Sequence, residues 1–379
     1  MTDHKLYPWL LLYHQNVLSD RPLLDLLNHF GSAQTLLDAD EAALRRLGIA
    51  SEPARAFLRA GTDPQLRARV DASLAWLDGA DNRYILPLPD ACYPPLLREI
   101  HDPPVLLFVQ GVLEALLLPQ LAIVGSRHCS VDGRRNTRYF GEALAKQGFS
   151  LCSGMARGID TAAHESALDV GGHTVAVMGT GADQYYPPQN RRLAQRIMEQ
   201  GALITELPLG SLPKPTHFPK RNRIISGMSL GLIVVEAALR SGSLITARLA
   251  IEHNREVFAV PGSIHNPLSA GPHRLLAQGA VLAEKPVEVA THLQSLLSSQ
   301  WSQLTGVTAQ ADVTQEAGAG VCAVDGNAKR VLEALGYEPV ALEVLMERTH
   351  MPLPQLQALL LELELQERVC HSAGHYLRC

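Results

Sequence analysis

The sequence lacks the features that mark several classes of protein. Its six cysteines are scattered and form no Cys-x-x-Cys pair, so neither a zinc ribbon nor a disulfide scaffold is expected. The longest apolar zone, 104–124, is interrupted by polar residues, glycine and proline, and therefore does not predict a membrane span. The first residues carry no cationic segment before an apolar stretch, so no secretory signal is expected either. These absences together predict a protein of the reducing cytoplasm that makes no use of a membrane.

An excess of positive charge is also missing. The 379 residues include 33 Lys and Arg against 38 Asp and Glu, a net charge of −5, which excludes a histone-like polycation. Hydrophobic residues make up 46% of the chain, too many for a disordered protein and enough for a substantial core. The length predicts about two or three domains.

The charge is distributed unevenly, and four segments differ clearly. Residues 1–80 carry 8 basic and 10 acidic residues, residues 81–295 carry 20 and 18, residues 296–324 carry none and 2, and residues 325–379 carry 5 and 8. Only the second segment has a positive balance, of +2. A polyanion such as nucleic acid is therefore expected to meet the chain within residues 81–295.

The three segments around the central one are expected to have different structures. In residues 1–80, leucines recur at helical spacing over 23–30 and 33–47, which predicts a helical domain. Residues 296–324 are rich in Ser, Gln, Ala, Thr and Gly and predict a flexible linker. The pattern of residues 325–379 is typical of a winged helix, with helices expected over 328–335, 339–348 and 353–366 and a hairpin over 368–377.

The central segment, 81–295, alternates apolar runs with amphipathic stretches. Strands are expected at 105–109, 121–124, 149–152, 174–178, 202–205, 231–235 and 257–260. Helices are expected between them at 136–147, 159–170, 191–200 and 243–253. This alternation predicts an α/β fold with a Rossmann-like, doubly wound, mostly parallel sheet that is covered on both faces. Such sheets bind ligands at the carboxyl ends of their strands.

Several loops that follow these strands are rich in Gly and Ser. Gly125-Ser126-Arg127 offers a close backbone approach, a hydroxyl and a guanidinium for a phosphate, although a tight turn with a solvated arginine fits the sequence too. Ser153-Gly154 opens a loop that is either a phosphate-binding helix entrance or a turn with Asp160 as the N-cap. Gly179-Thr180-Gly181 lacks the third glycine of a dinucleotide fingerprint, because position 184 is Gln, so no NAD site is expected.

The densest positive cluster lies within 214–223 and contains no acidic residue. Cations that hold phosphates beside an aromatic ring that stacks on a base are typical of single-strand binding. Prolines at 213, 215 and 219 are expected to keep the segment extended, and a solvated charged loop is the alternative interpretation. The cluster consists of Lys214, His217, Phe218, Lys220, Arg221 and Arg223.

A second group of polar residues follows the strand expected at 231–235. Within Ser241-Gly242-Ser243, Ser243 is a candidate N-cap for a helix whose free N–H groups can hold a phosphate. Glu236 is the best single candidate for an acid or a base, but an anchor for a cation of the cluster is the preferred interpretation, because no partner nucleophile is visible. His164-Glu165 is not part of an HExxH pattern, so no metal site and no cofactor are expected.

Six motifs occur in a fixed order along the chain. They are Gly125-Ser126-Arg127, Ser153-Gly154-x-Ala156-x-Gly158-Ile159-Asp160, Phe218-Pro219-x-Arg221-Asn222-Arg223, Ser241-Gly242-Ser243-Leu244-Ile245-Thr246-Ala247, Val260-Pro261-Gly262 and Gly279-Ala280. In this order they closely resemble the motifs of the DprA/Smf family of bacterial DNA-processing proteins. The resemblance is strong over about 83–290. It is weaker for the N-terminal helices, which resemble the family's SAM-like domain, and for the winged-helix-like tail.

The resemblance implies a binding protein rather than an enzyme. It implies that the protein binds single-stranded DNA without strong sequence preference, protects incoming strands during natural transformation and loads a RecA-type recombinase. It also implies a homodimer through the Rossmann-like domain, with Leu275 and Leu276 in the region where dimer and recombinase contacts are expected. Together with the loop analysis, it makes these the expected DNA contacts: Gly125, Ser126, Arg127, Ser153, Gly154, Lys214, Phe218, Lys220, Arg221, Asn222, Arg223, Ser241, Gly242 and Ser243.

This interpretation predicts how the strand is held. Phosphates are expected at the carboxyl edge of the sheet, Phe218 is expected to stack on a base, and loss of Arg127 or Arg223 is expected to flatten the salt dependence. Two alternatives stay open, a nucleotide-phosphate hydrolase with Glu236 as the acid or base, and a nucleotide sensor. Both rank lower because the basic segment is longer than one nucleotide needs. The net charge of −3 over residues 325–379 predicts protein contacts there rather than strong binding of duplex DNA.

Overall fold

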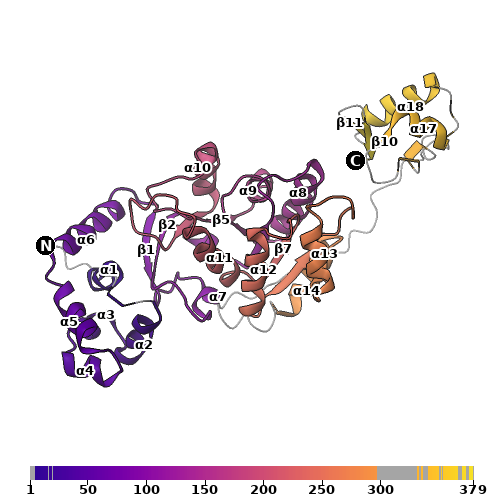
Figure 1. Cartoon of the computed structure of the whole chain (residues 1–379). Coiled ribbons are helices and arrows are strands. Elements are labelled where there is room, and N and C mark those ends of the chain that lie inside the picture. The colour runs from indigo at the N-terminus through magenta and orange to yellow at the C-terminus, as the bar shows by residue number, and fades with distance from the viewer. Residues whose placement is uncertain are drawn as a thin grey trace. The chain divides into compact units, whose positions relative to one another are not determined.

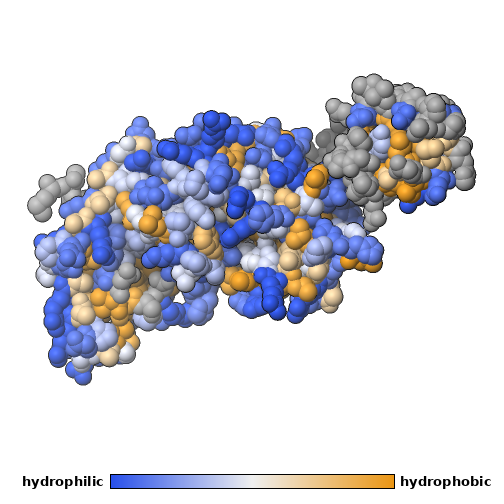
Figure 2. All heavy atoms as spheres, turned by 45° about the horizontal axis from the view of Figure 1, so that its top comes forward, coloured by the Kyte–Doolittle hydropathy of each residue, from blue (hydrophilic) through white to orange (hydrophobic). Residues whose placement is uncertain are grey.

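A computed structural model describes residues 5–296 except 16 and 19, and residues 331–378 except 333, 336–339, 350, 352, 366–368, 373 and 374. The chain divides into two compact units, Met1–Ala309 and Gln310–Cys379. Most of the linker expected at 296–324 therefore lies outside the described residues. No helix of the described part is long and apolar enough to cross a membrane. Hydrophilic side chains cover much of the face of the first unit that Figure 2 shows.

The first unit begins with short helices, as the leucine spacing predicts. Ser32, Asp40 and Asp63 each cap the start of one of them through a side-chain oxygen. The cap at Asp40 splits the helix expected over 33–47 into two, so that prediction of one helix is wrong. The helices are α1 (Tyr7–His14), α2 (Asp20–Phe30), α3 (Ala33–Leu37), α4 (Glu41–Arg46), α5 (Ser51–Ala60) and α6 (Pro64–Leu77). They form the indigo end of Figure 1, which we call the helical module.

A nine-stranded sheet follows, in the order β1-β2-β6-β5-β4-β3-β7-β8-β9. Its strands are β1 (Arg83–Pro87), β2 (Leu106–Gly111), β3 (Gln120–Val124), β4 (Ser150–Ser153), β5 (Thr174–Val177), β6 (Ala202–Thr205), β7 (Gly231–Val234), β8 (Glu256–Ala259) and β9 (Val281–Leu282). From β6 to β9 every pair is parallel, whereas β1 and β2 are added antiparallel. The predicted mostly parallel sheet is confirmed, and the sequence analysis missed β1 and β9.

Helices cover both faces of this sheet because apolar side chains alternate along its strands. On β3, Ala122 and Val124 pack with α7 (Pro95–Arg98), α11 (His217–Gly227), α12 (Gly242–Glu252) and α13 (Ala270–Ala277). Leu121 and Ile123 pack with α8 (Val131–Lys146), α9 (Ile159–Asp169) and α14 (Pro286–Leu296). The helix α10 (Arg191–Gln200) joins a third core that the helical module shares. In Figure 1, α8, α9 and α10 lie along the top of the sheet and α11 and α12 below them. This is the doubly wound arrangement that the sequence predicts.

One buried histidine gives the fold a pH dependence. Thr174 Oγ1 donates its proton to the Leu151 carbonyl, so His164 Nδ1, 2.7 Å from Thr174 Oγ1, is the donor between them. Burial lowers the pKa of His164 from 6.5 to about 3. Between these two values the unfolded chain binds a proton that the folded chain does not, so stability falls as the pH falls below 6.5.

We expect the neutral, buried His164 to lower the free energy of unfolding by about 1.4 kcal/mol for each pH unit by which the pH falls within this window. Urea unfolding at pH 6.5 and at about pH 5 measures it, and the loss in His164→Gln should be smaller than the loss in the wild type by about 2 kcal/mol. The exposed His265 supplies the control, because His265→Gln keeps the pH dependence of the wild type. Equal pH dependence in all three proteins would contradict a neutral, buried His164.

The second unit has the pattern of a winged helix in its described residues. A short strand, β10 (Val340–Ala341), is followed by α17 (Leu342–Thr349), α18 (Leu353–Leu365) and a hairpin of β11 (Val369–Ser372) and β12 (His375–Arg378). The three strands pair antiparallel in the order β10-β12-β11. The predicted hairpin is confirmed, while the helix expected at 328–335 lies only partly within the described residues.

Candidate nucleic-acid interface

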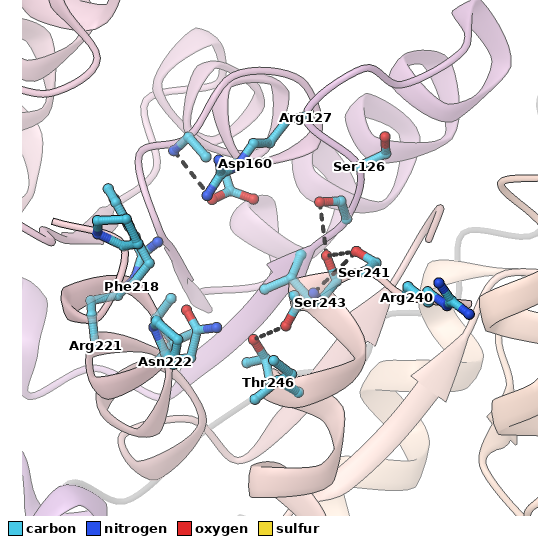
Figure 3. Close-up of a pocket in the computed structure, with 18 of the residues that line it drawn as sticks. Ser126, Arg127, Asp160, Phe218, Arg221, Asn222, Arg240, Ser241, Ser243 and Thr246 are labelled. Carbon is cyan, nitrogen blue, oxygen red and sulfur yellow. Dashed lines mark hydrogen bonds between the residues drawn. The ribbon is translucent and has the colours of Figure 1, made fainter. Parts of the chain in front are cut away.

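A cleft of about 760 Å³ opens at the carboxyl ends of β3 and β7 (Figure 3). Here the topology switches, because the chain leaves β3 toward α8 on one face of the sheet and leaves β7 toward α12 on the other. Loops that diverge in this way leave a crevice between them. The expected contacts that line the cleft are Gly125, Ser126, Arg127, Lys214, Phe218, Arg221, Asn222, Ser241, Gly242 and Ser243.

The start of α12 gives this cleft a backbone donor. Ser241, and not Ser243 as expected, caps the helix, because its hydroxyl accepts a hydrogen bond from the Ser243 N–H at 3.2 Å. Ser243 instead donates its hydroxyl proton to the Gly125 carbonyl at 2.9 Å and so ties the two loops together. Ser241 accepts from the Ser243 N–H through its hydroxyl and from the Leu244 N–H through its carbonyl, so the Gly242 N–H is the donor that the start of α12 leaves for an anion at this edge.

Four exposed cations surround this edge of the sheet. Arg127 and Lys214, both expected, line the cleft, and Arg240 also lines it. Arg157 lines a smaller neighbouring cavity together with Arg127 and Phe218. The sequence analysis missed Arg240 and Arg157, although Arg240 directly precedes the capping Ser241. The edge therefore carries more positive charge than the predicted residues alone supply.

Phe218 lies between three neighbours. The Arg127 guanidinium carbon lies 5.4 Å from the centre of its ring, and the Tyr186 ring lies 5.8 Å from it at a tilt of 44°. Gly179 packs closely on the ring as well, because a Cβ there would be 3.0 Å from two ring atoms. The exposed Arg127 side chain therefore occupies space over the ring that a stacked nucleobase would take.

Arg221 lines the cleft from below rather than as a free cation. It is 6% exposed and donates hydrogen bonds to the carbonyls of Gly154 and Val177. Burial raises the pKa of Asp160, and the Arg221 guanidinium opposes that shift by lowering it. Asp160 also accepts a hydrogen bond from the Ala156 N–H at 3.2 Å, while the N-cap of α9 is Gly158 and not Asp160 as proposed from the sequence. The buried Arg221 guanidinium thus stabilises the floor of the cleft.

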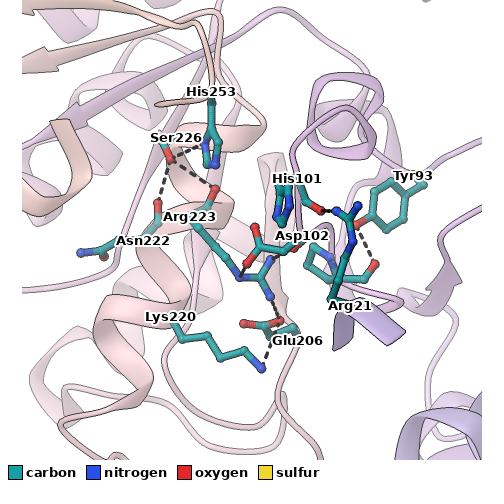
Figure 4. Close-up of polar contacts among 11 residues, drawn as sticks. Arg21, Tyr93, His101, Asp102, Glu206, Lys220, Asn222, Arg223, Ser226 and His253 are labelled. Carbon is teal, nitrogen blue, oxygen red and sulfur yellow. Dashed lines mark hydrogen bonds and ion pairs between the residues drawn. The ribbon is translucent and has the colours of Figure 1, made fainter. Parts of the chain in front are cut away.

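Arg223 does not line the cleft, contrary to expectation (Figure 4). Its guanidinium pairs with the Glu206 carboxylate, donates to the Asp102 carbonyl at 2.6 Å and lies 3.4 Å from the Asp102 carboxylate. Lys220 also lies away from the cleft lining, with its ammonium 3.9 Å from Glu206. From His217 onward the segment is not an extended loop, because His217–Gly227 form α11 and Pro219 sits in its first turn, where proline is tolerated. The side chains of Arg223 and Lys220 therefore lie on a part of α11 that does not line the cleft.

Three other expected contacts are covered by their neighbours. Ser153 is fully buried and donates its hydroxyl proton to the Ile123 carbonyl at 2.7 Å. Gly154 packs against the guanidinium of Arg221, where a Cβ would clash. Leu275 belongs to the core, and Leu276 is only partly buried against it. Of the two leucines, only Leu276 offers surface to a partner.

Glu236 has a structural partner that the sequence did not reveal. Its carboxylate accepts hydrogen bonds from the Ser130 N–H at 2.8 Å, the Ser130 hydroxyl at 2.5 Å and the Asn266 amide at 3.2 Å. Ser130 in turn caps α8, since its hydroxyl accepts from the Gly133 N–H at 2.9 Å. The expectation that Glu236 anchors a cation of the cluster is therefore wrong. Among the described residues, no group of three or more His, Cys, Asp or Glu could hold a metal ion.

Gly158 is required by the close approach of two loops, and this gives a test. Its φ is +78°, and a Cβ there would lie 2.3 Å from the Ser126 carbonyl oxygen. Gly148 also has a positive φ, of +91°, but a Cβ there meets open space. We expect Gly148→Ala to lower the free energy of unfolding by about 1–2 kcal/mol. Gly158→Ala should lower it clearly more, because only this substitution adds a clash with the backbone. Urea unfolding of both variants measures the difference, and equal losses would contradict the geometry of this loop.

An open, doubly wound sheet with a cleft lined by cations at its switch point defines a Rossmann-like α/β protein. The sequence pattern of the family described as DNA recombination-mediator protein A matches residues 84–294, and that of the DprA winged helix domain matches residues 315–375. The chain belongs to this DprA/Smf family.

Two relatives are similar in sequence to more than half of the chain. Protein Smf of Escherichia coli (strain K12) is 42% identical over 351 residues, which cover 92% of this chain and 90% of that protein. DNA processing protein DprA of Streptococcus pneumoniae is 47% identical over 205 residues, 54% of this chain and 72% of that protein.

Two solved structures are also similar. The X-ray structure of DNA processing protein A from Streptococcus pneumoniae has a TM-score of 0.67 and 37% identity, and it covers 77% of this chain and 98% of its own. A structure of DNA processing protein A from Helicobacter pylori, described as giving insights into its single-stranded DNA binding mode, has a TM-score of 0.50 and 29% identity. It covers 53% of this chain and 93% of its own.

Proposed function

We propose that this protein binds single-stranded DNA in the cleft at the carboxyl ends of β3 and β7. The observation that carries the proposal is the meeting of an exposed arginine, an aromatic ring and a helix start in one cleft. Cations and free N–H groups suit phosphates, and the ring suits any base, because every base has a π face. The single-stranded DNA binding mode described for the Helicobacter pylori relative supports the same class of ligand.

The contacts proposed for the strand differ in kind. Arg127, Lys214 and Arg240 meet phosphates, the start of α12 at Ser241-Gly242-Ser243 meets another, and Phe218 stacks on a base. Arg221, Ser153 and Gly154 hold the floor beneath them, and Asn222 lines the wall. Few of these groups can read base edges, so we propose binding with little sequence preference.

The wider role is proposed from the family. We infer that the protein works in the cytoplasm, protects incoming strands during natural transformation and loads a RecA-type recombinase, as a homodimer through the Rossmann-like domain. Residues 1–80, 81–295 and 325–379 then act as a SAM-like domain, a DNA-binding domain and a winged-helix domain, joined by the linker 296–324. Leu276 on α13 offers the partly exposed apolar side chain that such a partner contact needs.

Fluorescence anisotropy with labelled oligo-dT of several lengths tests the proposal. We expect tight binding that rises with length, weakens with salt and resists competition by duplex DNA. Tight mononucleotide binding without length dependence would overturn it and favour a nucleotide sensor. Turnover of nucleotides that Glu236→Gln abolishes would favour a hydrolase.

Arg127 is expected to supply one phosphate contact. In Arg127→Gln the slope of log K against log salt should become shallower by about 0.7, the value for one phosphate on a single strand. Anisotropy titrations at several salt concentrations measure the slope. The exposed Arg134, which does not line the cleft, is the control, and Arg134→Gln should leave the slope unchanged. A slope that does not change in Arg127→Gln would contradict this role.

A further inference from the structure

A second cavity, of about 420 Å³, lies between the helical module and the sheet. It belongs wholly to the first unit and is not part of the cleft described above. Its walls come from α1, α6, the start of β2 and the segment that follows β6, and Lys220 of α11 completes them. Its volume lies within the range of about 300–1,000 Å³ that small-molecule sites occupy.

The walls of this cavity combine apolar side chains with polar groups in about equal share. Leu12, Leu23 and Leu106 are buried there, and Val105 and Pro104 lie beside them. The apolar part of the lining suits the face of a flat, weakly polar body such as a nucleobase. The cavity therefore offers space and surface for an aromatic ring system.

One polar group in the wall has a fixed direction of hydrogen bonding. Ser73 donates its hydroxyl proton to the Arg69 carbonyl, so His14 Nε2, 2.9 Å from the Ser73 oxygen, must be the donor to it. Burial, with a smaller effect of Arg69, lowers the pKa of His14 to about 4, and the ring is neutral at physiological pH. A neutral imidazole that donates through Nε2 keeps Nδ1 as an acceptor. His14 can thus accept from an amino group or ring N–H of a base.

Two exposed cations border the cavity on different walls. Arg69 comes from α6 and Lys220 from α11, and Arg69 makes no ion pair with any described residue. Glu206 also lines the cavity, and its carboxylate pairs with the buried Arg223 and lies 3.9 Å from the Lys220 ammonium. Two cations from different helices that line one cavity suit a phosphate.

We propose that this cavity binds a nucleoside phosphate. The base lies between the apolar walls and donates to His14, and the phosphate lies between Arg69 and Lys220. The same chemistry can come from a nucleotide of a bound strand or from a free nucleotide, and the strand case rests on the function proposed above.

The helix α11 connects the cavity to the cleft. Phe218 and Asn222 line the cleft, whereas Lys220 of the same helix lines the second cavity. A helix with its side chains is about 10–12 Å across, which about three nucleotides span at a rise of about 3.4 Å each. A strand that leaves the cleft over α11 can therefore place a later nucleotide in the second cavity.

Two variants test the proposal on the full chain. Arg69→Gln removes one phosphate partner, and Ala72→Trp fills the cavity from an exposed position on α6. Arg67→Gln, on the same helix but outside the cavity lining, is the matched control. The probes are adenosine 5′-monophosphate and oligo-dT strands, short ones that only fill the cleft and longer ones.

For a free nucleotide, both variants should weaken adenosine 5′-monophosphate binding about tenfold, while Arg67→Gln leaves it unchanged. For a strand nucleotide, both variants should weaken only the longer oligonucleotides by a similar factor. If Arg69→Gln and Ala72→Trp change neither, or if nucleotide binding depends on Arg127 alone, the second site is overturned. If the wild-type protein binds none of the oligonucleotides, the proposed function is overturned. The measurements with adenosine 5′-monophosphate then still decide whether the second site exists.

Discussion

Replacing Arg223 with methionine should lower the free energy of unfolding by about 3–5 kcal/mol. The Arg223 and Glu206 side chains are 6% and 7% exposed and form an ion pair, so removing one leaves the other charge buried with less compensation. Arg223 also donates to the Asp102 carbonyl, which joins α11 to the segment before β2. Urea unfolding measures the loss. The double variant Arg223→Met with Glu206→Leu should recover part of it, because no buried charge then remains at this pair.

The salt dependence of DNA binding distinguishes this structural role of Arg223 from a contact with a phosphate. Under conditions where Arg223→Met is folded, its salt slope should equal that of the wild type, because the guanidinium does not line the cleft. Arg240→Met is the matched opposite, since Arg240 is exposed and lines the cleft. It should change stability by no more than about 0.5 kcal/mol and make the slope shallower by about 0.7. Unchanged stability with a shallower slope in Arg223→Met would restore the original expectation of a phosphate contact.

Phe218→Ala should weaken binding to oligo-dT by about 1–3 kcal/mol, or about 5- to 150-fold. The reason is the loss of the ring on which a base stacks once Arg127 has moved aside. Anisotropy titrations measure the affinity, and the salt slope should stay unchanged because no phosphate contact is removed. The effect should be largest for single strands, whose bases are free to stack.

Phe218→Tyr is the control for this prediction. It keeps the ring and should bind within about twofold of the wild type, since the gain or loss of one hydroxyl at a half-exposed position has a small effect. Circular dichroism checks that both variants keep the fold. Equal affinities of the alanine variant and the wild type would show that no base uses this ring.

Much of the sheet could be predicted from the sequence because its strands are apolar on both faces. The strand expected at 202–205 and the helix expected at 191–200 have the observed bounds, and the other central elements are shifted by a few residues. The strand β1 was missed because Pro87 ends it and only its last residues are buried. The antiparallel direction of β2 depends on its pairing with β6, which is a long-range property that local periodicity does not contain.

The site was harder to predict than the fold. Composition identifies the basic cluster, but the side of the helix on which each cation lies decides its role. Arg221 and Arg223 are two positions apart, so they point in different directions from α11, one to the floor of the cleft and one to Glu206. An extended segment, as expected from the prolines, would have left both free for phosphates. The partner of Glu236 was likewise out of reach, since Ser130 is 106 positions away in the sequence.

The contact between Arg127 and Phe218 makes base stacking an exchange rather than a simple addition. In the proposed binding mode the ring, which lies 5.4 Å from the Arg127 guanidinium carbon, exchanges this cation for a base, and the released guanidinium meets a phosphate of the same strand. Stacking and phosphate binding are then coupled through the Arg127 side chain. The contact that Arg127 gains with a phosphate offsets the contact with Phe218 that it loses. A nucleoside without a phosphate must displace the guanidinium and leaves it with water alone. The cleft should therefore select phosphorylated ligands even through a contact that touches only the base.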